Sequence, residues 1–298
     1  MTRRPTPKRR RGSRAERRFA ALFLLPTLAL IGIFRIYPLL RGFWLSFTDT
    51  NGLGQGGYVG GENYIRAVTD PNFQDSIVNT LLLLATLPIW IMLPMLLAIL
   101  IHQGVPGGKV FRAVYFLPAV LSSVIVGSIF NVVLRFDGSL NAALGVIGID
   151  AVDWLGGSAT ALGSLIAVQL WSTFGMSVLI FMSGLSTVPD DIVEAARIDG
   201  ATFWQRLFLI IIPSLRPIIE FVAVVTTIGV LTSMFGLIYV LTGGGPGTAT
   251  TMPEFLIWLE QGKLNRPGYA AAISMILFLM MAGVAYAQVR IMSRNARV

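Results

Sequence analysis

The most polar stretch within this hydrophobic chain runs from Val188 to Pro217 and reads VPDDIVEAARIDGATFWQRLFLIIIPSLRP. This polar loop carries four acidic residues and three arginines, and long apolar segments lie on both sides of it. Carboxylates such as Glu194 and Asp199 can accept charge-assisted hydrogen bonds from Arg or Lys of another protein. The small side chains of Ala195 and Ala196 leave room for a partner to approach closely. These residue types indicate non-covalent docking to a protein.

The order of residues within the polar loop predicts two short helices joined by a sharp bend. Pro189 suits the first turn of a helix, and the two aspartates after it complement the positive helix end. Gly200 can end that helix in the left-handed conformation, and a second helix is expected from Thr202 to Pro213. An interfacial helix with no protein partner is the alternative. Such a helix normally favours Lys and Arg, whereas residues 190–199 are mainly acidic, which favours docking.

The composition is typical of a membrane protein. Hydrophobic residues make up 54% of the 298 residues and charged residues 13%, with a mean hydropathy of +0.72. A soluble domain of this length needs a more charged surface. A helix of about 20 apolar residues can cross a bilayer, and five long runs contain no Asp, Glu, Lys or Arg. We therefore expect an all-α polytopic membrane protein with six spans, at Phe19–Phe47, Ser76–Ile101, Val110–Leu134, Ala161–Ser183, Pro217–Leu241 and Tyr269–Ile291.

The net charge of +8 originates in the N-terminal segment. Residues 1–18 hold nine basic residues and one acid, while basic and acidic residues balance in the remaining chain. This distribution disfavours a nucleic-acid-binding domain and predicts a basic, disordered tail beside anionic lipid. Lys and Arg number seventeen in the segments on the side of this tail and four in the opposite loops. The positive-inside rule therefore predicts that both termini are cytoplasmic, with a second tail at 293–298.

Residues for other chemistry are sparse. The chain has no cysteine and a single histidine, His102, so it offers no thiolate and no histidine pair to a metal ion. It has no GxxxxGK[ST] sequence for nucleotide phosphates and no residue pattern typical of catalysis. Polar residues in or near the later spans could contact a solute, although Ser and Thr commonly bond their own helix backbone. These candidates are Asn131, Gln169, Trp171, Ser172, Thr173, Thr226, Thr227, Thr232 and Ser233.

The polar loop also carries a motif. Glu194-Ala195-Ala196 is followed by three residues, Gly200, nine residues and then the run that ends at Pro213. This pattern resembles the EAA loop of binding-protein-dependent ABC importer permeases, with Ile212 where that family usually has Leu. The segments NTLLLL, FRAVYFLPAVLS, DGSLNAALG, IYVLTGGGPGTAT and GYAAAISMILF extend the resemblance over most of the chain. Together they resemble the carbohydrate-type branch, the maltose and glycerol-3-phosphate permeases, and its first-subunit type in particular.

The resemblance implies a type I ABC importer permease fold, with the six-span domain at residues 19–292 and the EAA coupling loop at 188–217. It implies a non-catalytic subunit of a prokaryotic cytoplasmic membrane transporter that works by alternating access. The expected partners are a second homologous permease subunit, two ATP-binding cassette ATPase subunits and an external substrate-binding protein. No cofactor is expected on this chain, because ATP and Mg are used by the ATPase subunits. The residues expected to couple ATPase motion to the spans are Glu194, Ala195, Ala196, Asp199, Gly200 and Pro213.

The sequence indicates the identity of the transported solute less clearly than it indicates the family. A sugar or sugar-like solute is favoured, with Trp171 as a residue that could stack on a sugar face. Glycerol-3-phosphate or a glycerophosphodiester is the alternative. A secondary transporter that needs no ATPase is disfavoured, because ion-coupled carriers usually place acids within their spans. Glu220 is the only acid within a predicted span. It follows Arg216 by one helical turn, which predicts a local ion pair.

Overall fold

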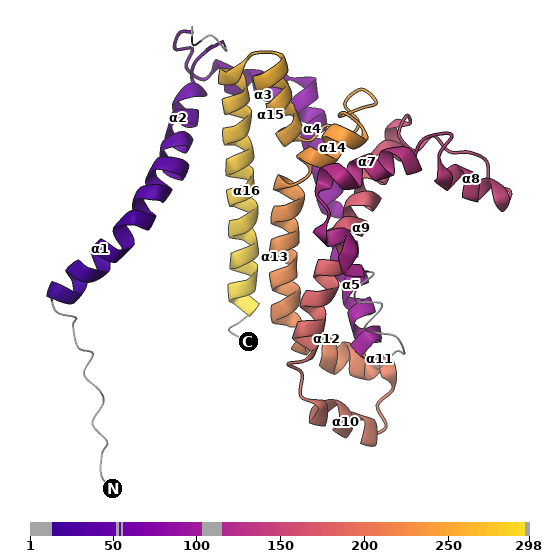
Figure 1. Cartoon of the computed structure of the whole chain (residues 1–298). Helices are drawn as coiled ribbons and strands as arrows, with labels where there is room; N and C mark the ends of the chain where they lie inside the picture. Colours follow the sequence, from indigo (N-terminus) through magenta and orange to yellow (C-terminus); the bar gives the residue numbers. More distant parts are fainter. Residues whose placement is uncertain (1–13, 52–53, 55, 103–114, 296–298) are drawn as a thin grey trace.

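The structure, a computed structural model, describes residues 14–51, 54, 56–102 and 115–295, and long helices dominate it (Figure 1). Three short π-helical turns, η1 to η3, are inserted between α-helical segments. The helices of the described chain include α1 (Arg14–Ile31), η1 (Gly32–Ile36), α2 (Tyr37–Leu45), α3 (Glu62–Thr69), α4 (Pro71–Ala85), α5 (Leu87–His102), α7 (Ser123–Val133), α8 (Ser139–Val146), α9 (Ser158–Leu185), α10 (Asp190–Ile198), α11 (Phe203–Arg206), η2 (Leu207–Ile211), α12 (Ile212–Ser214), α13 (Arg216–Thr232), α14 (Phe235–Leu241), α15 (Pro253–Trp258), η3 (Leu259–Lys263) and α16 (Pro267–Asn295).

Four helices of the described chain are long and apolar enough to cross a membrane. They cover Leu22–Leu45, Pro71–His102, Ser158–Leu185 and Pro267–Ser293, and they correspond to the first, second, fourth and sixth predicted spans. The sixth span ends later than predicted, because α16 continues to Asn295, inside the segment expected as a C-terminal tail. Similarly, α1 begins at Arg14, so residues 14–18 are helical although they were expected to be disordered. The expected tail residues 1–13 lie outside the described residues.

The predicted fifth span was wrong at its outer end. Helix α13 ends at Thr232, and a separate helix, α14, begins at Phe235. The buried carboxyl of Glu254 lies near the backbone N–H groups of Met234 and Phe235, at the start of α14, and their dipoles favour its ionised form. In a continuous helix these N–H groups would donate to carbonyl groups one turn earlier. A carboxyl group near them can compensate for the loss of those bonds, so the helix can break here although the backbone is buried. At its other end, α13 meets the 203–214 helical segment at a bend of 66°.

The predicted third span, Val110–Leu134, is only partly visible, because residues 103–114 lie outside the described chain. The visible part is interrupted, since one helical stretch covers 115–120 and α7 starts at Ser123. Ser122 has an extended backbone, and its hydroxyl accepts a hydrogen bond from the Ile125 backbone N–H at 3.4 Å. A single continuous helix up to Leu134 was therefore wrong, and a serine N-cap explains where the second piece begins.

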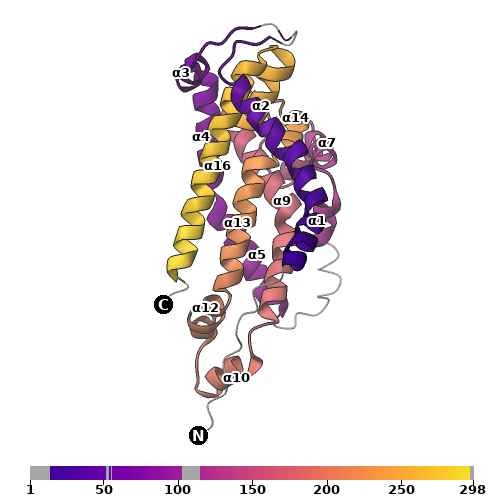
Figure 2. The ribbon, with the colours of Figure 1, turned by 90° about the vertical axis from the view of Figure 1, so that its left-hand side faces the viewer.

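The long helices run between two ends of the molecule (Figures 1 and 2). Helix α10 lies at one end, which we call the inner end, and the start of α1 and the last turn of α16 point toward it. Helices α3 and α15 lie at the opposite, outer end (Figure 1). Helix α9 joins two buried clusters, contributing Leu165 to one and Phe181 to the other. This long helix therefore connects the packing of the outer half to that of the inner half.

The first span stands apart from the other helices over most of its length (Figure 1). None of the residues in its most apolar window is buried within this chain. Its outer end, α2, packs against α16. The backbones approach most closely at Gly268, where an added Cβ would lie 2.0 Å from the carbonyl oxygen of Thr48. A glycine is required here because any side chain would push the two elements apart.

The outer loops are folded onto the helices beneath them. The side-chain amide of Asn79 on α4 donates to the carbonyl oxygens of Thr248 and Thr251, at 2.8 and 3.0 Å. The hydroxyl of Thr248 donates to Asp75 at 2.6 Å. These bonds hold the glycine-rich TGGGPGTATT segment against α4.

We predict that Gly268→Ala lowers the stability of the protein, because its methyl group would collide with the Thr48 backbone. Overpacking of this kind costs about 1–3 kcal/mol. The matched control is Gly283→Ala on the same helix, where an added Cβ meets nothing within 4 Å. Thermal unfolding of the purified variants in detergent measures the effect. Equal unfolding temperatures for the two variants would contradict the close contact.

We also predict a pH-dependent stability from Glu254, in the loop between the last two spans. Burial raises the pKa of this carboxyl from 4.5 to about 7. The folded protein therefore binds a proton that the unfolded chain releases, so stability falls as pH rises from about 4.5 to 7, by about 3 kcal/mol. Glu254→Gln removes this charge and keeps an oxygen acceptor. Its melting temperature should exceed that of the wild type at pH 8 and match it at pH 4.5; an equal difference at both pH values would refute the assignment.

Candidate functional site: the polar loop and a membrane cavity

The first helix of the polar loop ends as the sequence predicts. Helix α10 covers Asp190–Ile198, and Gly200 after it has a φ of +79°. The Gly200 N–H donates to the Arg197 carbonyl at 3.2 Å, and the Ala201 N–H donates to the Ala196 carbonyl at 2.9 Å. These two bonds form a Schellman motif, which satisfies carbonyl groups at the end of a helix. The expected left-handed cap at Gly200 is confirmed.

A capping box starts the second helix directly after the bend. The Thr202 N–H donates to the Gln205 side chain at 2.7 Å, and the Gln205 N–H donates to the Thr202 hydroxyl at 3.3 Å. The guanidinium of Arg206 also donates to the Ala201 carbonyl. A helix start near Thr202 was predicted, but the capping box was not, although the T-x-x-Q spacing signals it. The bend between the two helices is therefore fixed by hydrogen bonds on both sides.

Helix α10 presents the predicted coupling residues at the inner end of the molecule (Figures 1 and 2). Glu194, Ala195, Asp199 and Gly200 are exposed, and Ala196 is half-buried. Two large apolar side chains, Ile192 and Ile198, are 52% and 81% exposed. Apolar and acidic side chains together on one projecting helix form a surface suited to protein docking.

Pro213 does not lie with the other coupling residues. It is exposed on α12, in the last turn of the helical segment Phe203–Ser214 and just before the 66° bend into α13. The Arg216 guanidinium forms an ion pair with Glu220 at 3.2 Å, as the spacing predicted. Pro213 thus marks the entry of the chain into the fifth helical span rather than the docking surface.

A second candidate site is a cavity of about 240 Å³ between α5, α9 and α13. Five of the nine solute candidates line it, namely Gln169, Ser172, Thr173, Thr226 and Ser233. None of the described side chains that line it is charged. The lining residues that the sequence analysis did not single out are Trp90, Ala119, Met176, Ser177, Ile180, Val222, Val225, Gly229 and Val230.

Gln169 is the most informative residue of this cavity. It is 6% exposed, and its side-chain amide forms no hydrogen bond with the described residues. The hydroxyls of Ser172 and Thr173 donate to the Gln169 carbonyl, at 2.9 and 3.0 Å, which leaves their oxygens able to accept. A buried polar group normally finds a partner, so this amide and these hydroxyls can bind a polar solute in the cavity.

The four remaining candidates do not line this cavity. The Asn131 amide donates to the Leu241 carbonyl at 3.1 Å, and the Thr232 hydroxyl donates to Ile228 at 2.8 Å. The Thr227 hydroxyl accepts a bond from Gln288 at 2.8 Å. Trp171 packs edge-on against Phe130, with ring centroids 5.0 Å apart. Helical periodicity could not show which side chains face the cavity, because that depends on how α9 and α13 are oriented against α5 in the fold.

Comparison with known proteins assigns this architecture to a family. The chain matches the family described as "Binding-protein-dependent transport system inner membrane component" over residues 72–295. Because the match covers most of the chain, the protein belongs to this family. The resemblance drawn from the EAA motif is thereby confirmed. The chain is a non-catalytic permease subunit and a multi-pass membrane protein.

Particular relatives extend along almost the whole chain. The multiple sugar-binding transport system permease protein MsmF of Streptococcus mutans is 36% identical over 272 residues, covering 90% of this chain and 93% of its own. The trehalose/maltose transport system permease protein MalF of Thermococcus litoralis is 30% identical, covering 89% and 90%. A bacterial alginate ABC transporter, crystallised with a pentasaccharide-bound periplasmic protein, contains a chain with a TM-score of 0.81 at 23% identity, covering 92% and 93%. This last likeness shows the ABC permease fold.

Proposed function

We propose that this chain is a transmembrane permease subunit of an ATP-driven importer that carries a sugar or sugar-like solute into a prokaryotic cell. The observation that carries the proposal is the cavity between α9 and α13, where Gln169 and several hydroxyls face an uncharged space. Amide and hydroxyl groups suit the hydroxyls of a sugar, and Trp90 offers an aromatic surface beside them. The relatives named for sugar transport support this cargo.

Glycerol-3-phosphate or a glycerophosphodiester would require a cationic site for its phosphate. No Lys or Arg lines the described cavity, so a neutral solute fits this chain better. The proposed site is formed mainly by Gln169, Ser172, Thr173, Thr226 and Ser233. We place Trp171, Asn131, Thr227 and Thr232 beside the pathway rather than in it.

The proposed topology has six spans with both termini in the cytoplasm of a cell with a prokaryotic cytoplasmic membrane. The inner end of the molecule then faces the cytoplasm, which places α10 and the basic N-terminal segment on the same side. The third span would be the predicted Val110–Leu134, interrupted at Ser122. This arrangement agrees with the excess of Lys and Arg in the segments assigned to the inside.

The proposed partners are a second homologous permease subunit, two ATPase subunits and an external substrate-binding protein. The unburied first span offers a large lipid-level surface that the second permease subunit could cover. ATP and Mg would be bound by the ATPase subunits, which would grip α10 through Glu194, Ala195, Ala196, Asp199 and Gly200. Pro213 would help to set where the loop enters the membrane. Movement of α10 would switch the cavity between inward-open and outward-open states.

Uptake by the assembled transporter in proteoliposomes tests the proposal. With ATP inside and the cognate binding protein outside, a radiolabelled neutral sugar should accumulate, and accumulation should stop when the ATPase subunits are omitted. Uptake by this chain alone would overturn the ATP-driven mechanism. Competition by excess glycerol-3-phosphate, without competition by any sugar, would overturn the proposed cargo.

Gly200→Val tests the coupling role. A β-branched residue is disfavoured at positive φ by about 1–2 kcal/mol, so the bend after α10 should distort. We expect the complex to assemble and hydrolyse ATP, with roughly tenfold less solute transported per ATP. Gly200→Asn is the matched control, because Asn tolerates this backbone conformation. Wild-type uptake by Gly200→Val would remove the bend from the coupling mechanism.

Gln169→Leu tests the cavity. Leucine has a similar volume but supplies no hydrogen bond, so we expect the apparent KM for the solute to rise roughly tenfold. The control is Gln261→Leu, the same change at an exposed position of the outer segment η3. Uptake measured over a range of solute-loaded binding protein gives both constants. An unchanged KM would place the solute elsewhere.

A further inference from the structure

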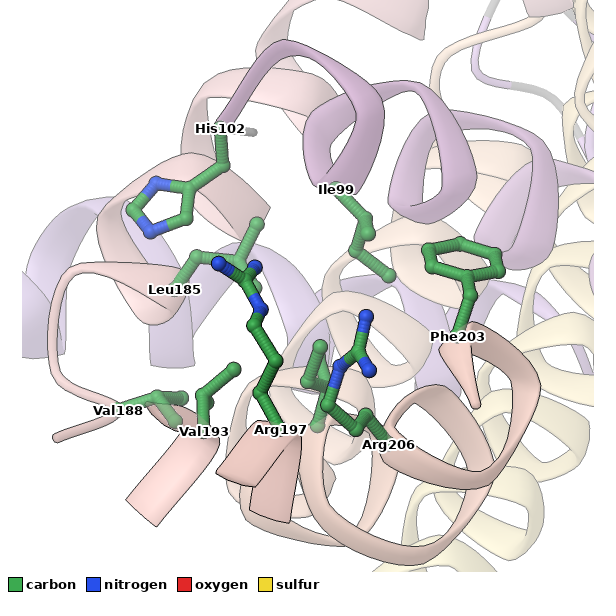
Figure 3. A pocket seen from close by; sticks show the side chains of 9 residues that line it. Ile99, His102, Leu185, Val188, Val193, Arg197, Phe203 and Arg206 are labelled. Carbon is green, nitrogen blue, oxygen red and sulfur yellow. The ribbon is translucent and has the colours of Figure 1, made fainter. Parts of the chain in front are cut away.

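A second cavity lies behind α10, where the polar loop meets the inner ends of two spans (Figure 3). Its volume is about 210 Å³. Apolar side chains from α5, α9, α10 and η2 form much of its wall, including Ile99, Leu185, Val193 and Ile211. The cavity therefore lies between the docking helix and the helices that it would move.

Two arginines extend into this cavity from the two helices of the polar loop. Arg197 reaches in from α10 and Arg206 from α11, and His102 stands at the end of α5 beside them (Figure 3). No Asp or Glu is among the lining residues in the part of the chain that the structure describes. The exposed acids of α10, including Glu194 and Asp199, are also absent from the lining.

The two guanidinium groups lack acidic partners within the described chain. The ion pairs among the described residues join other side chains, and neither Arg197 nor Arg206 takes part. Arg206 donates one bond to the Ala201 carbonyl, whereas no described acceptor bonds the Arg197 side chain. Two like charges that share a partly apolar cavity repel each other, and an anion between them would relieve that repulsion.

We propose that this cavity binds a phosphate group held jointly by Arg197 and Arg206. A guanidinium matches phosphate through two parallel hydrogen bonds, and a phosphate has three or more oxygens to share between two such groups, whereas a carboxylate has two. The apolar wall suits the glycerol and first acyl carbons of an anionic lipid, and basic pockets between helices on the cytoplasmic side bind such headgroups. A free phosphate ion presents the same chemistry without the apolar part.

The bound phosphate would act on coupling, an effect that rests on the proposed role of α10. It would link α10 to α11 across the bend, because it would bind one arginine from each helix, and it would hold both helices close to the end of α5. The bend would then flex less, so a larger part of any displacement of α10 would reach the spans. The site therefore adjusts coupling to the phosphate or anionic lipid present at the inner membrane surface.

Binding to the purified, assembled transporter in neutral detergent tests this inference without transport. Short-chain fluorescent phosphatidylglycerol is titrated against wild type and the double variant Arg197→Gln/Arg206→Gln. We expect the apparent Kd to rise at least about tenfold in the variant, because several charge-assisted hydrogen bonds are lost. Arg216→Gln is the control, since Arg216 carries the same charge nearby but pairs with Glu220 outside the cavity.

Inorganic phosphate, added at constant ionic strength, separates the two sources of the ligand. Displacement of the lipid by phosphate identifies a site for the free ion, and retention of the lipid identifies a lipid site; both support the inference. Arg197→Lys/Arg206→Lys, which keeps charge and loses the planar fork, should bind with intermediate affinity. The inference would be overturned if the wild type bound neither ligand. It would also be overturned if the wild type and a folded double glutamine variant bound with equal affinity. Either result would point to an acidic side chain of a partner protein as the ligand of the two arginines. Such a result would not contradict the proposed transport function, because solute uptake is measured in a separate assay.

Discussion

Satisfaction of backbone hydrogen bonds at helix breaks is the constraint on which this structure depends. In a bilayer, unpaired N–H and C=O groups cost several kcal/mol each, so a chain can bend only where other groups take over. Ser122 caps α7, Glu254 serves the start of α14, and the carbonyls of α10 are satisfied by the Schellman bonds after Gly200. Each break therefore has a chemical cause that can be located in one or two side chains.

The same constraint makes the polar loop a rigid part. The cap at Gly200 and the box between Thr202 and Gln205 leave little freedom between α10 and α11. A loop that only connected two spans would not need fixed geometry on both sides of its bend. A loop that transmits a displacement would, because flexibility at the bend would absorb the motion. The local hydrogen bonding thus supports coupling independently of the family resemblance.

Much of this could be predicted from the sequence, and the limits have physical reasons. The EAA pattern and Gly200 identified the bend, because only a few residues tolerate positive φ. Hydropathy located four long spans, but it could not find the break at Ser233. That break lies beside the buried carboxyl of Glu254, twenty-one residues later in the chain, and local periodicity carries no information on so distant a neighbour. Likewise, Gln169 and Thr232 were both candidates because they are polar residues in or near predicted spans. Only the fold shows that Gln169 faces the cavity, whereas Thr232 bonds the backbone of its own helix.

The connectivity explains how the polar loop could act on the cavity. Helix α9 carries Gln169 near its middle and leads, after four residues, into α10. Helix α13 carries Thr226 and follows directly from the second helix of the loop, across the 66° bend. Helices α9 and α13, which form two walls of the cavity, are therefore connected along the chain to the two ends of the hydrogen-bonded polar loop. Leu185, Leu207 and Leu215 pack together in one buried cluster at this junction. Packed interiors deform little and transmit strain, so the proposed movement of α10 would reach the proposed solute pathway through both the covalent connection and the side-chain packing.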